Sequence, residues 1–211
     1  MTFQFCTDWF SSHIPLWKKY LNTFAHQPDV HMLEVGTFEG RAACWLLQHI
    51  LTHPTSTLTC VDLFEMTIHK QAGMAGLLHA LPPLFDLEQR FMHNITQTGS
   101  ANRVNTVRGK SSETLRTLPL ASYDMIYIDG SHKAHDVLCD AILSWELLKT
   151  EGILIFDDYE LALSPDPLLN PRKGIDSFLD VFSGQFTILE KGWQIFLRKQ
   201  STKHTRSNGE V

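Results

Sequence analysis

The chain has 211 residues, of which 43% are hydrophobic and 19% are charged, and its formal net charge is -5. A chain of this length can bury one sizeable core, so we expect a single domain over residues 1–199. The acidic balance argues against a nucleic-acid binder, because such proteins usually carry a basic face.

No apolar run of about 18 residues is present, so we expect no membrane partner. The N-terminus lacks the basic and apolar pattern of a secretory signal. The four cysteines have no CxxC spacing, which fits reduced thiols better than disulfides or zinc. Together these features predict a cytoplasmic protein.

The predicted elements begin with a helix and continue as strands that alternate with helices. Pro15 opens a segment of apolar residues at helical spacing, so residues 8–27 are predicted to form an N-terminal helical segment. Short apolar runs predict strands at 30–36, 56–64, 104–109, 123–130 and 152–158. Helices are predicted at 38–51, 111–118, 132–148 (with Ile142 facing inward) and 174–182, and a hairpin is predicted from 185–190 and 193–199.

This alternation predicts an α/β fold with a doubly wound, seven-stranded sheet. Strands joined through helices must run parallel, whereas the closing hairpin must be antiparallel, so the sheet is expected to be mostly parallel. Such sheets bind ligands beyond the carboxyl ends of their strands. The unusual polar clusters of this sequence all fall at such strand ends.

Residues 66–103 interrupt the alternation. They contain the Pro82-Pro83 pair and two phenylalanines, Phe85 and Phe91, that read as exposed. Long connections usually carry function or their own helices, so this segment is either a helical lid over a substrate pocket or a subdomain that pads the sheet. The tail, residues 200–211, is nearly devoid of apolar residues and is predicted to be disordered.

A glycine turn follows the first predicted strand, in the stretch "LEVGTFEGRAA". Gly36 and Gly40 would let the backbone approach a nucleotide-like cofactor, although glycine at such a turn is often only structural. Asp62, at the end of the next strand, is placed to accept hydrogen bonds from ribose hydroxyls. An ordinary acid at a strand end is the alternative.

Three acids follow the fourth and fifth predicted strands. Asp129 ends "YIDG", and Asp157 and Asp158 end "GILIFDD". If the two strands are neighbours, like charges about 4 Å apart would repel by about 4 kcal/mol at an effective dielectric constant of 20. The acids therefore need a cation, a shared proton or separation by solvent, and oxygen ligands suit Mg²⁺. The alternative is that the Asp157-Asp158 pair only turns the chain.

Two histidines begin the helix after Asp129. His132 has the properties of a general base, because an unperturbed histidine is partly neutral at cellular pH. A solvent-facing histidine at a helix start is the alternative. His135 stands three residues later, but no third helical ligand follows at a spacing that would suit zinc.

These motifs occur in an order that resembles a known family. "LEVGTFEG", "VDLFE", "GKSSETL" and "YIDGSHKAHDVLCDAILSWELLKTEGILIFDDY" are similar to the class I S-adenosylmethionine-dependent methyltransferases. More narrowly, they resemble the branch of divalent-metal-dependent O-methyltransferases that act on macrolide sugars and catechols. The resemblance covers roughly residues 30–198 and is strongest in 123–159.

The resemblance implies a Rossmann-like fold and assigns roles to individual residues. For S-adenosylmethionine it implies contacts by Glu34, Gly36, Thr37, Phe38, Gly40, Asp62, Ser111, Ser112 and Asp129. For Mg²⁺, or another divalent cation, it implies Asp129, Asp157 and Asp158. His132 falls at the position of the general base, with Lys133 as a substitute. Asp157 departs from the pattern, since sugar-type relatives often have glutamate there.

We therefore expect a magnesium-assisted O-methyltransferase whose acceptor is a hydroxyl of a small molecule, either a sugar or a secondary metabolite. The alternatives are a protein that binds the cofactor without turnover and a metal-independent N-methyltransferase. The apolar N-terminal helix is compatible with a homo-oligomer.

Overall fold

The computed structural model describes residues 2–65 and 86–201. Its centre is a seven-stranded sheet with the strand order β3-β2-β1-β4-β5-β7-β6. The strands are β1 (His31–Val35), β2 (Thr57–Asp62), β3 (Val104–Arg108), β4 (Tyr123–Ile128), β5 (Leu148–Phe156), β6 (Phe186–Lys191) and β7 (Ile195–Lys199). Strands β1 to β5 pair in parallel, and β7 pairs antiparallel with both β5 and β6. The predicted fold class is confirmed.

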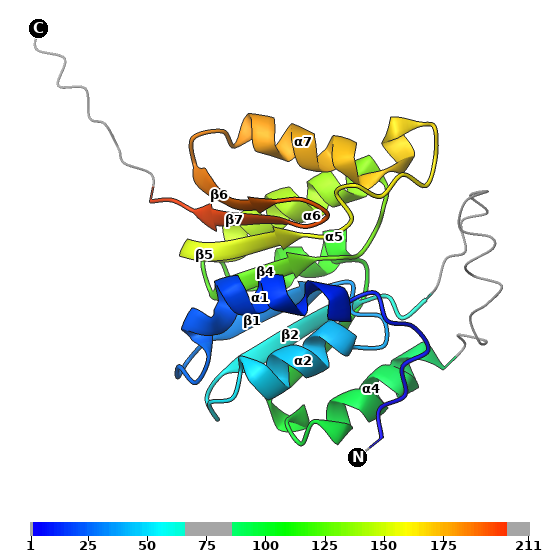
Figure 1. Cartoon of the computed structure of the whole chain (residues 1–211), viewed down its shortest axis with the longest axis vertical. Helices are drawn as coiled ribbons and strands as arrows, with labels where there is room; N and C mark the ends of the chain where they lie inside the picture. Colours follow the sequence, from blue (N-terminus) through cyan, green and yellow to red (C-terminus); the bar gives the residue numbers. More distant parts are fainter. Residues whose placement is uncertain (1, 66–85, 202–211) are drawn as a thin grey trace, which may run out of the picture.

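The helices cover both faces of the sheet (Figure 1). On one face lie α1 (Ile14–Leu21), α2 (Arg41–His49) and α4 (Leu87–Gln97). On the other lie α5 (Ser111–Thr114), α6 (Ala134–Leu147) and α7 (Pro171–Val181). Short 3-10 turns, η1 to η5, comprise Ser11–His13, Asn22–Phe24, Ala101–Arg103, Leu115–Thr117 and Pro167–Leu169.

Alternating side chains of the central strands form a hydrophobic core on each face. In β4, Met125 and Tyr127 join the core under α1, α2 and α4, whereas Ile126 and Ile128 join the core under α6 and α7. This alternation follows from the period of two in a strand. Because both faces are apolar, polar side chains are left for the carboxyl edge of the sheet.

The N-terminal helix is anchored to the C-terminal hairpin. Trp17 of α1 is fully buried, and its indole Nε1 donates a hydrogen bond of 2.9 Å to Oε1 of Gln194. The Tyr20 hydroxyl donates to the backbone carbonyl of Leu189 at 2.6 Å. Helix α1 is therefore held against the hairpin of β6 and β7.

Two expectations about exposure were wrong. Phe91 is fully buried, because it lies on α4 and packs in the core against Phe64 with ring centroids 5.2 Å apart. Ile142 is 41% exposed, because α6 turns that side away from both the sheet and α7. Helix α6 also ends at Leu147, so Leu148 belongs to β5.

Part of the 66–103 insertion is now described. Residues 87–97 form α4, an ordinary layer of the fold that contacts α2. The prediction of a lid falls largely on residues 66–85, which lie outside the described residues, as does most of the tail that was predicted to be disordered. Within the described ranges, none of the helices has the length and apolar character needed to cross a bilayer.

Candidate active site

The loop between β1 and α2 has an unusual backbone, with φ of +83° at Gly36, +49° at Phe38 and +79° at Gly40. Position 36 requires glycine for two reasons, namely its positive φ and the close approach of the neighbouring backbone. A Cβ there would lie 2.2 Å from the backbone oxygen of Asp129, so any other residue would push β1 away from β4. At Gly36 the glycine loop therefore packs directly against the backbone of Asp129.

Gly40 has a different structural reason. It precedes the first residue of α2, and a Cβ at this position would lie 2.7 Å from the Phe91 ring of α4. Packing of α4 therefore explains this glycine. Gly40 is also the one predicted site residue that does not border the cavity described below.

Asp62 holds the glycine loop through its carboxylate. Oδ2 accepts hydrogen bonds from the backbone N–H groups of Thr37 at 2.7 Å and Phe38 at 2.9 Å, and Oδ1 accepts from the N–H of Phe64 at 2.6 Å. A carboxylate has about four acceptor positions, so roughly one remains for a ligand. The loop thus has a fixed shape that depends on Asp62.

Glu34 is a buried acid beneath the same loop. Its Oε2 accepts hydrogen bonds from the Thr37 hydroxyl at 2.7 Å and, more weakly, from the Cys60 thiol at 3.6 Å. Burial raises the pKa of Glu34 from 4.5 to about 8, and these hydrogen bonds only partly oppose the shift. The buried position of Glu34 therefore favours its protonated form.

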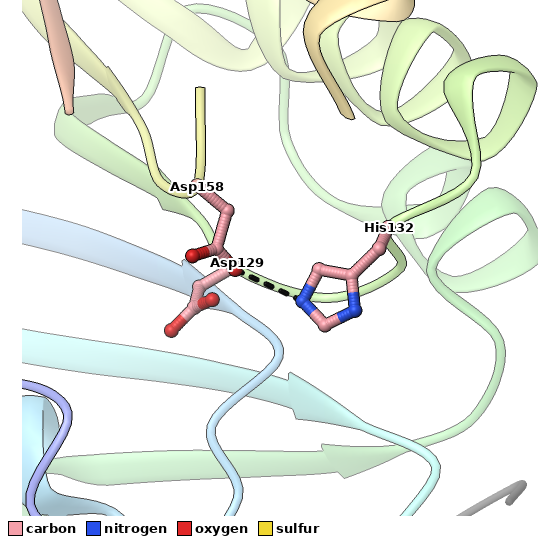
Figure 2. Close-up of side chains that lie close together, drawn as sticks. All are labelled: Asp129, His132 and Asp158. Atoms are coloured by element: carbon pink, nitrogen blue, oxygen red, sulfur yellow. Dashed lines mark ion pairs between the residues drawn. The ribbon is translucent and has the colours of Figure 1, made fainter. Parts of the chain in front are cut away.

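The second part of the site is formed by Asp129, His132 and Asp158, whose ligand atoms all lie within 4.8 Å of one another. Figure 2 shows the three side chains pointing toward one another, with a dashed line for the ion pair of His132 and Asp158. His132 Nε2 lies 2.9 Å from Asp158 Oδ2. Burial raises the pKa of Asp129 well above its usual range, and the charges of Asp157 and Asp158 add to the shift. The cluster therefore favours a bound positive charge or a proton.

Asp157, next to Asp158, has hydrogen-bond partners of its own. Its carboxylate accepts hydrogen bonds from the Tyr127 hydroxyl, from Gln194 Nε2 at 3.0 Å and from the backbone N–H of Asp158 at 2.7 Å. Tyr127 also contacts Asp129, at 2.9 Å. The three acids that sequence reasoning grouped therefore lie at one edge of the sheet, where Asp158 pairs with His132 and Asp157 shares the Tyr127 hydroxyl with Asp129.

Sequence reasoning missed Tyr127 and Gln194. The signal for Tyr127 was its position two residues before Asp129, since alternate residues of a strand face the same side. For Gln194 there was no signal, because its contact with Asp157 joins residues 37 positions apart. His135, for which sequence reasoning found no zinc partners at a suitable spacing, has a side chain that is 75% exposed and pairs with Asp136.

A cavity of about 1190 Å³ joins the two parts of the site at the carboxyl edge of the sheet. The predicted site residues that line it are Glu34, Gly36, Thr37, Phe38, Asp62, Ser111, Ser112, Asp129, His132, Asp157 and Asp158, together with Lys133. Trp9 of the N-terminal segment and Trp193 of the hairpin border it as well. A volume of this size has room for a cofactor and a second small molecule.

Comparison with known proteins agrees with this arrangement. Residues 33–159, more than half of the chain, match a family described as a methyltransferase domain. The chain belongs to this family. The resemblance to methyltransferases inferred from the sequence is therefore confirmed, and the glycine loop and the acid cluster both lie in the matched part of the methyltransferase.

Two curated proteins are similar in sequence to parts of this methyltransferase. The O-methyltransferase hkm8 of Aspergillus hancockii is 33% identical over 60 residues, which are 28% of this chain and 23% of that protein. An uncharacterized protein of Acanthamoeba polyphaga mimivirus is 24% identical over 151 residues, covering 72% and 61% of the two chains. The chain therefore spans less than two thirds of the length of these relatives.

A solved structure extends the likeness to the whole fold. The O-methyltransferase TomG from Streptomyces achromogenes, described as involved in tomaymycin synthesis and solved in complex with SAM, has a TM-score of 0.67 with this methyltransferase. The match covers 92% of this chain and 82% of that chain at 17% identity. At this identity the likeness establishes the fold.

Proposed function

We propose that this methyltransferase transfers a methyl group from S-adenosylmethionine to a hydroxyl oxygen of a small molecule, a sugar or a secondary metabolite, with the help of a divalent cation. One observation carries the proposal: a single cavity is bordered by both the glycine loop and the acid cluster. A cofactor and an acceptor bound in this cavity would be neighbours. The O-methyltransferase hkm8 and the SAM complex of TomG support the choice of oxygen and of S-adenosylmethionine.

The cofactor end of the proposed site comprises Glu34, the loop at 36–38 and Asp62. Asp62 retains about one acceptor position for a ribose hydroxyl, and Gly36 lets the loop pack against the backbone of Asp129. Glu34 would accept a hydrogen bond from a cationic amino group, which would stabilise the ionised carboxylate. Ser111 and Ser112, which follow β3, would border the purine.

The acid cluster fits a divalent cation by its donor set and by its electrostatics. Carboxylate oxygens and a nitrogen converge within 4.8 Å, and desolvation together with neighbouring acids disfavours the ionised form of Asp129. Asp129 and Asp158 would hold Mg²⁺, which prefers oxygen ligands. The Asp157 carboxylate would keep Asp158 in place, because it accepts a hydrogen bond of 2.7 Å from the backbone N–H of Asp158.

The chemistry needs a deprotonated acceptor oxygen. When bound, S-adenosylmethionine supplies an electrophilic methyl group, and a divalent cation lowers the pKa of a nearby hydroxyl. We assign His132 the removal of the hydroxyl proton, which its Nε2 would hold while the acceptor oxygen bonds to the methyl carbon and the bond between that carbon and the sulfonium sulfur breaks, which leaves S-adenosylhomocysteine. Nε2 lies 2.9 Å from Asp158 Oδ2, and a cation held by Asp158 would free this nitrogen to accept the proton.

Calorimetric titration of S-adenosylmethionine into the purified protein, with and without Mg²⁺, tests the proposal. We expect binding in both cases and a separate Mg²⁺ heat that Asp158→Ala removes. Asp180→Ala is the matched control, because Asp180 is an exposed acid on α7 outside the cavity. His132→Ala should retain cofactor binding and slow turnover of a hydroxylated acceptor by about 10²- to 10⁴-fold.

The other outcomes distinguish the alternatives. Failure to bind S-adenosylmethionine under either condition would contradict the proposal. Cofactor binding without turnover of hydroxylated or amine acceptors would indicate a protein that only binds the cofactor. Methyl transfer to an amine, unaffected by chelation of divalent cations, would indicate a metal-independent N-methyltransferase.

A further inference from the structure

The imidazole nitrogen of His132 belongs to the same group of potential ligand atoms as the acids. Nε2 lies 2.9 Å from Asp158 Oδ2, and one atom from each of Asp129, His132 and Asp158 falls within 4.8 Å of the other two (Figure 2). A cation held by the carboxylate of Asp158 would therefore lie within reach of this nitrogen. Whether the nitrogen binds the cation then depends on which cation is present.

A small hollow is bordered by the same residues. Its volume is about 10 Å³, close to the volume that one water molecule requires. Its lining includes three acids, a histidine and apolar groups, namely Asp129, Asp157, Asp158 and His132 together with Ile128, Val137 and Pro171. A hollow of this size suits a single water molecule or metal ion and is too small for an organic ligand.

The spacing of the ligand atoms suits a small ion with four ligands. With metal–ligand bonds of about 2.0 to 2.1 Å, tetrahedral ligand atoms lie about 3.4 Å apart. The separation of 2.9 Å between His132 and Asp158 and the limit of 4.8 Å for the whole set lie on either side of this value. Asp129 can contribute Oδ1, because the Tyr127 hydroxyl contacts its Oδ2 at 2.9 Å. The fourth position would be left for water.

Divalent cations differ in whether they would bind this nitrogen. Mg²⁺ prefers oxygen ligands and retains several waters, so it would bind the carboxylates and leave Nε2 of His132 free. Zn²⁺ binds imidazole nitrogen as well as carboxylate oxygen. Because Nε2 of a neutral imidazole has a single lone pair, it cannot bind an ion and accept a proton at the same time.

We propose that Zn²⁺ binds to Asp129, Asp158 and Nε2 of His132, competes with Mg²⁺ for the acids and blocks the base. This inference rests on the proposed function, because it takes His132 to be the group that accepts the hydroxyl proton. The three ligands follow β4, follow β5 and precede α6, so the spacing of histidines along one helix does not indicate the site. Zn²⁺ would then inhibit the methyl transfer that Mg²⁺ supports.

The metal affinities of His132→Ala test whether the nitrogen is a ligand. Competition with a zinc-binding dye measures the affinity for Zn²⁺, and calorimetry measures the affinity for Mg²⁺. We expect Zn²⁺ binding to weaken by about 100-fold or more, since groups that only orient a metal ligand already contribute about 10- to 100-fold. Mg²⁺ binding should change by less than about threefold, because Mg²⁺ is held by oxygen.

His135→Ala is the matched control. His135 lies three residues after His132, but its side chain is 75% exposed and pairs with Asp136. This variant should keep both metal affinities. His132→Gln, which keeps a polar side chain without the imidazole, is a second variant that should lose the tight Zn²⁺ binding. Binding of S-adenosylhomocysteine shows whether each variant is folded.

Chemical modification tests whether Zn²⁺ blocks the base. Diethyl pyrocarbonate acylates unprotonated imidazole nitrogens whose lone pair is free, and mass spectrometry of peptides locates the product. We expect saturating Zn²⁺ to protect His132 and saturating Mg²⁺ to leave it reactive. The exposed His135 should react in both cases and serves as the internal control.

The outcomes separate this inference from the proposed function. If the wild-type protein binds neither ion, the cation site of the proposed function fails as well. If Mg²⁺ binds but His132→Ala keeps the Zn²⁺ affinity, or weakens both ions equally, only this inference fails. Reaction of His132 at an unchanged rate with Zn²⁺ bound would also overturn it, because Nε2 would then be free. Protection by Mg²⁺ as well would contradict both, since the proposed base must be free when Mg²⁺ is bound.

Discussion

At the scale of single residues, Glu34 links the site to the stability of the protein. Its pKa of about 8 lies above its ordinary value of 4.5, so the folded state favours the protonated form. The stabilisation from this group is fully present below pH 4.5 and is lost as the pH rises through about 8. Ligand-free protein should therefore lose stability toward alkaline pH.

Glu34→Gln removes this titration while keeping the shape of the side chain. As the pH rises from 5 to 9, we expect the unfolding free energy of the wild type to fall relative to that of the variant, by at most about 5 kcal/mol. Urea unfolding of both proteins at the two pH values measures the difference. A difference that does not change with pH would show that Glu34 keeps the same charge across this range.

The residues at the ends of β4 and β5 could be predicted only in part from the sequence. The cluster at the ends of β4 and β5 was predictable, because the carboxyl ends of neighbouring parallel strands meet at one edge. The different hydrogen-bond partners of Asp157 and Asp158 were not. Asp158 has a φ of +59°, a conformation that no sequence pattern indicates.

At the scale of helices and strands, the contact between Gly40 and Phe91 links the glycine loop to α4. Gly40→Ala combines an unfavourable φ with a Cβ that would lie 2.7 Å from the Phe91 ring, so we expect a loss of about 2 to 4 kcal/mol in unfolding free energy. Denaturant unfolding measures this loss.

A second variant tests the cause. Phe91→Leu removes the ring, so adding it to Gly40→Ala should cost less than the sum of the two single changes, by about 1 kcal/mol. Strict additivity would mean that the φ at position 40 alone accounts for the loss. Gly99→Ala is a useful control, since Gly99 also has a positive φ, +73°, but nothing lies within 4 Å of its Cβ position.

Sequence reasoning predicted the strands better than it predicted this helix. The strand pattern is local, since short apolar runs alternate with helices. In α4 the apolar residues Leu87, Phe91 and Ile95 do recur every four positions, but they follow a long stretch rich in proline and glycine. That context suggested a helical lid or a subdomain that pads the sheet, and Phe91 was wrongly taken as exposed.

At the scale of the whole molecule, two linked hydrogen bonds connect α1 to the β6-β7 hairpin and the hairpin to Asp157. Trp17 donates to Gln194, and Gln194 donates to Asp157. Because Gln194 Oε1 accepts the hydrogen bond from Trp17, the Nε2 of the same amide faces Asp157. The orientation of Asp157 thus depends on both α1 and the β6-β7 hairpin.

Gln194→Leu should leave the Trp17 N–H without an acceptor and Asp157 without one of its donors. We expect a loss of about 2 to 5 kcal/mol in unfolding free energy and weaker binding of Mg²⁺. Denaturant unfolding and calorimetry measure the two effects. Lys19→Ala is the control, because its ion pair with Glu190 joins the same elements at the surface and should matter little.

The Asp62 contacts have a consequence for how quickly a ligand can enter and leave. The N–H groups of Thr37, Phe38 and Phe64 are already held in the ligand-free protein, so binding does not have to order this loop. Association should then be a single diffusional step whose rate rises in proportion to ligand concentration. Ligands that bind this loop would then differ in affinity mainly through their dissociation rates, and less through their association rates.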